Sequence, residues 1–145
     1  MRTLALVSAA IIWAAPAAAF GPPQQHIFYI DGYPVSCRGS AVIANWNLPD
    51  VGMARPGLIQ LNPGAMSAMP TSLKLFVFAH ECAHGLGIMN EAAADCWGIR
   101  RGRDQGWFPP QAFAQVVQYF QNNPGDYTHA PGPARLRNLA NCYRS

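Results

Sequence analysis

The chain has 145 residues, of which 12% are charged and 50% hydrophobic, with 13 glycines and 13 prolines. This length fits one small domain, and the hydrophobic content excludes a disordered polar chain. The formal net charge of +3 comes without a basic stripe, so the sequence indicates no nucleic-acid partner.

The first 19 residues have the pattern of a secretory signal peptide. Arg2 provides a positive start, an apolar run extends from Leu4 to Ala15, and an A-x-A cleavage site ends at Ala19. The run is too short to span a bilayer as a mature helix. We expect residues 1–19 to be a signal peptide, residues 20–145 to form a mature domain without a membrane span, and the protein to be secreted or periplasmic. The alternative is an N-terminal membrane anchor.

Strand patterns fill the first half of the mature chain. The Asp31-Gly32 pair between two apolar runs predicts a β-hairpin. Residues 47–56 are rich in Pro, Gly and Asp and predict a loop. The predicted strands are His26–Ile30, Tyr33–Cys37, Ser40–Trp46 and Gly57–Leu61.

Helix patterns fill the second half. Pro70 precedes a helix that Thr71 or Ser72 is expected to cap. Its apolar residues cover nearly every face, so we expect it to be central and buried. Asn90 can cap the next helix. The predicted helices are Thr71–Leu86, Glu91–Arg100, Gln111–Gln121 and Ala134–Asn141. Strands followed by helices indicate an α+β fold.

The buried helix contains the sequence His80-Glu81-Cys82-Ala83-His84, which is an H-E-x-x-H motif. His80 and His84 are one turn apart, so both imidazoles leave the same face of the helix. Two neutral imidazoles at this spacing can bind one zinc ion, and Glu81 can serve as general base toward a zinc-activated water. The alternative is a hydrogen-bonded core cluster without metal.

The following segment offers a third ligand. Glu91 and Asp95 are four residues apart in an E-x-x-x-D pattern and therefore share one helix face. H-E-x-x-H followed by E-x-x-x-D resembles the gluzincin metallopeptidases of the CAAX-prenyl-protease type and their bacterial relatives. The resemblance implies a small zincin-like domain in which Glu91 is the third zinc ligand and Asp95 orients His80 or His84. Asp95 is the alternative ligand.

The same stretch is also similar to the metzincin motif, with Gly87 at the glycine position. That motif would place a ligand at Asn90, and a neutral amide is a poor zinc ligand. The tail segment Tyr127-Thr128-His129-Ala130-Pro131 with Arg135 is similar to a late gluzincin segment. The resemblance implies that His129 or Tyr127 donates a hydrogen bond to the oxyanion, and that Arg135 pairs with a carboxylate near the site, such as Asp95.

Two further expectations concern the surroundings of the motif. Zinc peptidases carry an edge strand that pairs with extended substrate, and Gly57–Leu61 is the candidate here. The four cysteines, an even number in an exported chain, indicate two disulfides. Three pairings are possible, and we favour Cys82–Cys96, which would join the two ligand helices from behind, with Cys37–Cys142. Cysteine-bound zinc is the rival, but the chain has no C-x-x-C pair.

These observations together predict an exported zinc metallopeptidase that acts on a peptide or protein substrate. His80, His84 and Glu91 would bind zinc, while Glu81 and His129 would take part in the chemistry. Two alternatives remain. One is a non-catalytic zinc-holding or interaction domain on a peptidase scaffold, and the other is a metal-free structural protein stabilised by disulfides.

Overall fold

The computed structural model describes residues 27–145. The predicted signal peptide, residues 20–25 and His26 at the start of the first predicted strand lie outside this part. The fold is α+β, as predicted, with strands followed by helices. The strands are β1 (Phe28–Ile30), β2 (Tyr33–Val35), β3 (Ala41–Ala44), β4 (Gly52–Arg55) and β5 (Leu58–Leu61). The helices are α1 (Pro63–Met66), α2 (Thr71–Gly85), α3 (Glu91–Asp104), α4 (Pro110–Phe120) and α5 (Gly132–Arg144).

The predicted hairpin forms from β1 and β2, which pair antiparallel. Its turn residues Asp31 and Gly32 have φ angles of 48° and 85°, the left-handed pair that a type I′ turn requires. The hairpin is fastened to the start of α2, because Thr71 Oγ1 donates a hydrogen bond to Asp31 and Lys74 Nζ pairs with the same carboxylate. Neither Thr71 nor Ser72 caps α2; Pro70 occupies the N-cap without a side-chain hydrogen bond.

A second sheet has the order β3-β5-β4, with β3 parallel and β4 antiparallel to β5. This order corrects two predictions. The Gly57–Leu61 segment forms the central strand, not an edge, and the predicted loop over residues 47–56 contains β4, which is an edge strand. The strand signal of β4 is weak because the strand is short and begins with Gly52, a residue that strands disfavour.

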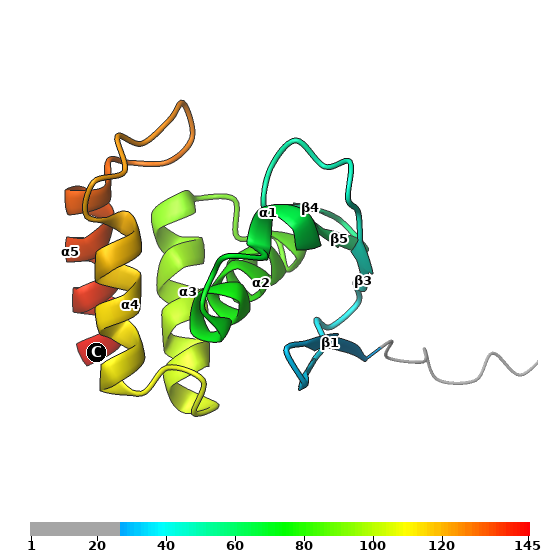
Figure 1. Ribbon diagram of the computed structural model, residues 1–145, viewed down its shortest axis with the longest axis horizontal. Coiled ribbons are helices and arrows are strands. Elements are labelled where there is room, and N and C mark those ends of the chain that lie inside the picture. Colours follow the sequence, from blue (N-terminus) through cyan, green and yellow to red (C-terminus); the bar gives the residue numbers. More distant parts are fainter. Residues whose placement is uncertain (1–26) are drawn as a thin grey trace, which may run out of the picture.

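Helix α2 lies in the middle of the molecule. The three-stranded sheet packs on one side of it, α3 packs on the other side, and α5 packs on α3 (Figure 1). Ten of the 15 residues of α2 are buried, which matches its apolar sequence. No helix in residues 27–145 has the length and hydrophobicity needed to cross a membrane.

Two disulfides are present, Cys37–Cys82 and Cys96–Cys142, so the favoured pairing is wrong. The reason is the side on which α3 packs. Because α3 lies against the His80 face of α2, Cys82 on the opposite face is directed to the segment after β2. Cys96 instead faces α5. The two bonds tie α2 to the N-terminal hairpin and α3 to the C-terminal helix.

Candidate metal centre

The last turn of α2 positions His84. The helix ends in a Schellman motif, in which Gly87 with a φ of 91° occupies the left-handed position. The N–H groups of Gly87 and Ile88 donate to the carbonyls of His84 and Ala83. This turn aims the carbonyl of Ile88 at the helix, where it accepts a hydrogen bond from His84 Nδ1 at 2.8 Å. The chain then reverses within a few residues.

Helix α3 begins immediately after this turn. Asn90 is its N-cap and accepts a hydrogen bond from the N–H of Ala93 at 2.9 Å, so Asn90 has a structural role and the metzincin-like ligand position is not used. Ala94 is fully buried, and a Cβ added to Gly98 would lie 3.2 Å from the backbone nitrogen of His80. These small residues let α3 approach α2 closely, which brings Glu91 to the two histidines.

Three potential ligand atoms converge there. Nε2 of His80 lies 3.0 Å from Nε2 of His84, and Oε2 of Glu91 lies 3.1 Å from the first and 3.4 Å from the second. Hydrogen bonds at the other ring nitrogen set both tautomers. His80 Nδ1 donates to Asp95 Oδ1 at 2.9 Å, and His84 Nδ1 donates to a carbonyl. With Nδ1 engaged in this way in both rings, the Nε2 atoms are the ring nitrogens that can direct a lone pair at the common centre.

A cation between the three atoms would bind all of them at once, because two imidazole nitrogens and a carboxylate oxygen are donors typical of zinc sites. Within residues 27–145, Oε2 of Glu91 is buried and accepts no hydrogen bond of good geometry. Four ligands around zinc at bond lengths of about 2.0 Å lie roughly 3.3 Å apart, which is close to the separations here. The His-His-Glu group can therefore hold a metal ion.

Glu81 lies next to this centre under the edge strand. The residue is 8% exposed, and burial raises the pKa of its carboxyl from 4.5 to about 7. A Cβ added to Gly52 would lie 2.9 Å from Cγ of Glu81, so only glycine lets β4 come this close. A carboxyl whose pKa lies near neutrality is suited to accept and return a proton.

Asp95 connects the centre to α5. Its carboxylate is 2% exposed. It accepts from His80 and receives two hydrogen bonds of 2.6 Å from Arg135. Burial acts to raise the pKa of Asp95, but the hydrogen bonds from His80 and Arg135 outweigh it and hold the pKa below its usual value. The carboxylate is thus ionised and fixed, and it orients the ring of His80.

The loop between α4 and α5 brings His129 over the centre. His129 Nε2 lies 3.0 Å from Glu91 Oε2, and its Nδ1 lies 3.1 Å from Asp126. Backbone and side-chain hydrogen bonds from His129 and Thr128 hold the pKa of Asp126 below its usual value. Tyr127, the other predicted oxyanion donor, is completely exposed and does not join the cluster.

Edge strand β4 borders the centre with free backbone groups. The N–H of Asn62 donates to the carbonyl of Val51, and bonded and non-bonded pairs alternate along an antiparallel ladder. Given the register of β4 on β5, Gly52 and Ala54 direct their N–H and C=O groups away from β5. No other strand of the described chain pairs with this side.

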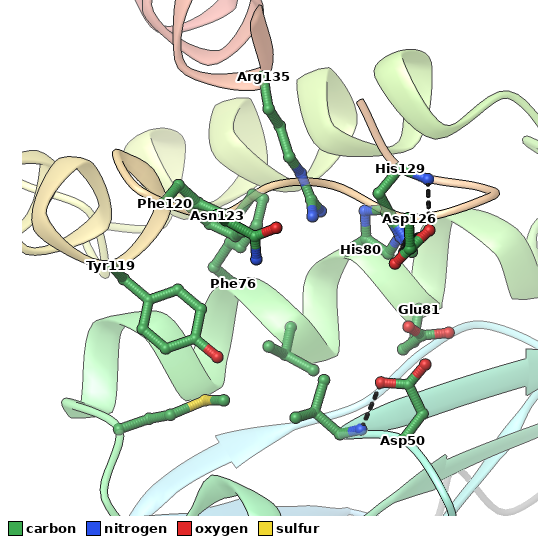
Figure 2. A pocket seen from close by; sticks show the side chains of 13 residues that line it. Asp50, Phe76, His80, Glu81, Tyr119, Phe120, Asn123, Asp126, His129 and Arg135 are labelled. Carbon is green, nitrogen blue, oxygen red and sulfur yellow. Dashed lines mark hydrogen bonds and ion pairs between the residues drawn. The ribbon is translucent and has the colours of Figure 1, made fainter. Parts of the chain in front are cut away.

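Hollows lie on both sides of the centre along β4. One, lined in part by Asp50, Val51 and Glu81, extends toward α4 (Figure 2). The other is more open and is lined in part by Ala54, Arg55 and His84. The residues just before β4 thus border one hollow, and the last residues of β4 border the other. An extended chain laid beside this strand would pass directly over Glu81 and the three ligand atoms.

All six site residues singled out from the sequence (Glu81, His129, His80, His84, Glu91 and Asp95) meet in this region. Sequence reasoning missed three neighbours, Gly52, Asp50 and Asp126. The turn-forming residues around Asp50 and Gly52 predicted a loop, so the sequence did not indicate that a strand there lies beside Glu81. For Asp126 a signal existed, since Asp126 and His129 are three residues apart in a short loop. Comparison with known proteins gives no match to a protein-family model, a curated protein or a solved structure.

Proposed function

We propose that this protein is an exported zinc-dependent metallopeptidase that hydrolyses peptide bonds. The observation that carries the proposal is the convergence of His80, His84 and Glu91 at one point beside Glu81, along an open strand edge. A site built only to hold a metal needs no general base and no access for a substrate. The donor set of two imidazoles and one carboxylate, which leaves a coordination position open, is a known form of catalytic zinc site.

Zinc, when bound, would activate a water molecule and polarise the carbonyl of the substrate. Glu81 would accept the proton of the attacking water and return it to the nitrogen of the leaving amine. The raised pKa of Glu81 supports this role, although a bound cation would itself lower that pKa. His129 would donate a hydrogen bond to the developing oxyanion, oriented by Asp126.

The substrate would be a peptide or protein segment in extended form. The free N–H and C=O groups of Gly52 and Ala54 offer backbone hydrogen bonds to such a segment. These bonds are independent of side chains, so β4 would hold the substrate and set its register over Glu81. Export is supported by the pattern of the first 19 residues and by two disulfides, which persist in oxidising compartments.

A second candidate function is a non-catalytic zinc-holding domain. The observation that favours it is the position of His129, whose Nε2 lies 3.0 Å from Oε2 of Glu91. If His129 supplied a fourth ligand, the site would be closed in the manner of structural zinc sites. The two functions share the metal and differ in hydrolysis.

The test begins with the zinc content of the oxidised, untagged mature protein. We expect about one zinc per chain, and no zinc after reconstitution at neutral pH would refute both candidate functions. Hydrolysis of casein is then compared between the native protein and Glu81→Gln. We expect the variant to keep zinc and to lose at least about a hundredfold in rate.

The matched control is Asp104→Asn, which removes an exposed carboxylate at the end of α3 and should leave the rate unchanged. Zinc binding without hydrolysis by the native protein would favour the second candidate. Full activity of Glu81→Gln would exclude Glu81 as the general base.

A further inference from the structure

A pocket opens beside Glu81 on the side of α4, and six of the 13 residues that line it are apolar or aromatic. Its volume is about 170 Å³. Phe76, Phe120 and Met69 line it and are 2%, 5% and 8% exposed. An apolar cavity of about 150 Å³ is enough to take up a benzene molecule. The pocket therefore has room for one large side chain of a substrate.

The mouth of the pocket is acidic. Asp50 and Asp126 line it together with Glu81, so three carboxyl groups gather at this opening (Figure 2). The arginine that lines the pocket, Arg135, is already bound to Asp95 through two hydrogen bonds. A substrate carboxylate that entered the mouth would meet the like charges of Asp50 and Asp126, while Arg135 is already engaged with Asp95.

Tyr119 completes the pocket on the side facing solvent. Its side chain stands across the pocket from Asp50 and Glu81 (Figure 2), and the residue is 45% exposed. Because much of Tyr119 is in solvent, its removal would enlarge the pocket without opening the core. This residue can therefore set the size of the side chain that enters.

We propose that this pocket selects the substrate: the site cleaves extended peptides beside a bulky apolar or aromatic residue and discriminates against an acidic residue at that position. The proposal rests on the metallopeptidase function proposed above and adds its substrate class. The wall residues bury the substrate side chain, and Asp50 and Asp126 reject carboxylates. Tyr119 is the specificity-determining residue for size.

The experiment uses the zinc-loaded mature protein and a set of peptides that differ at one residue beside the cleaved bond. Mass spectrometry of casein fragments first identifies the cleaved bonds and shows whether the preferred residue lies before or after the cleaved bond. The variable residue is then Phe, Leu, Ala, Trp or Asp. We expect kcat/KM for Phe and Leu to exceed that for Ala by about tenfold to a hundredfold, with Asp the poorest.

Two variants connect this preference to the pocket. Tyr119→Ala should shift the preference from Phe toward Trp, and the control Tyr29→Ala, which truncates an exposed tyrosine on β1, should not. Asp50→Asn should reduce the ratio between the Phe and Asp peptides by about fivefold, the effect of one nearby charge in a solvated site. Asp104→Asn should leave this ratio unchanged.

The possible results separate the two proposals. If the zinc-loaded protein cleaves casein but treats all five residues alike, the pocket is not a substrate subsite and this inference fails alone. An unchanged preference in Tyr119→Ala, with the variant folded by circular dichroism, would also overturn it. If no peptide and no protein is cleaved, the metallopeptidase function itself fails.

Discussion

Replacement of Asp95 by Asn is the most direct perturbation of the metal centre that leaves all three candidate ligands in place. The buried carboxylate accepts one hydrogen bond of 2.9 Å from His80 and two of 2.6 Å from Arg135. Asn has the same shape, but it lacks the negative charge and one of the two acceptor oxygens. The amide nitrogen of Asn would then face an N–H donor of His80 or Arg135, and two donors cannot form a hydrogen bond with each other.

Two magnitudes follow from this geometry. The Arg135 side chain is 13% exposed, and removing one partner of a buried ion pair costs about 3–5 kcal/mol of folding free energy. His80 would also lose the acceptor that fixes its tautomer, and loss of such an outer partner weakens metal binding by about tenfold to a hundredfold. The variant should therefore be both less stable and weaker in zinc binding.

The assay measures each effect separately. Urea unfolding of the metal-free, oxidised protein gives the free energy of unfolding, and competition with a zinc chelator gives the zinc affinity. Asp104→Asn on the same helix is the matched control, because the carboxylate of Asp104 is exposed and, within residues 27–145, pairs only with the adjacent Arg103. We expect it to change stability by less than about 0.5 kcal/mol. A folded Asp95→Asn protein with native zinc affinity would refute the role of Asp95 in orienting His80.

Three further predictions concern other parts of the site and its support. In the metal-free protein, burial raises the pKa of Glu81 from 4.5 to about 7, so the folded state binds the proton more tightly than the unfolded state does. The free energy of unfolding should therefore fall by about 3 kcal/mol as the pH rises from below 4.5 to above 7. Urea unfolding at pH 4 and pH 8 should show a pH dependence that Glu81→Gln reduces by this amount, and an equal pH dependence in both proteins would contradict the burial argument. Gly52→Ala should reduce casein hydrolysis at least about tenfold with zinc content retained, because the new Cβ would meet Cγ of Glu81 at 2.9 Å; native hydrolysis rates would show that the close approach is unimportant. Replacing both Cys37 and Cys82 by Ala should lower the free energy of unfolding by about 4 kcal/mol, the loop-closure value for a sequence separation of 45 residues, and a loss below 1 kcal/mol in urea unfolding would show that the open loop is already restrained.

Local features of the fold were predictable from the sequence. The Asp31-Gly32 turn needs two left-handed residues and has them. The four-residue spacing in H-E-x-x-H placed His80 and His84 on one face of a helix. Asn90 marked the start of the next helix. Each of these signals depends on neighbouring residues alone, which is why each could be read without knowledge of the tertiary fold.

Features that depend on contacts between distant segments were less accessible. The disulfide pairing depends on the face of α2 against which α3 packs, and no local sequence pattern predicts that face. The edge strand was hidden because Gly52 weakens a strand signal, yet the close approach of the strand to Glu81 requires this glycine. The site thus demands a residue that sequence patterns associate with loops.

The open edge of β4 has a consequence for how the protein behaves in a crowded solution. An unpaired strand edge can join the sheet of another molecule and begin an aggregate. Here the exposed edge is only four residues long, Pro56 follows it immediately, and Arg55 places a positive charge at its end. Short length, proline and charge are the means by which sheet edges resist permanent association. Under the proposed function, the edge would accommodate a substrate chain through a few hydrogen bonds, and its short length would work against lasting association of two copies of the protein.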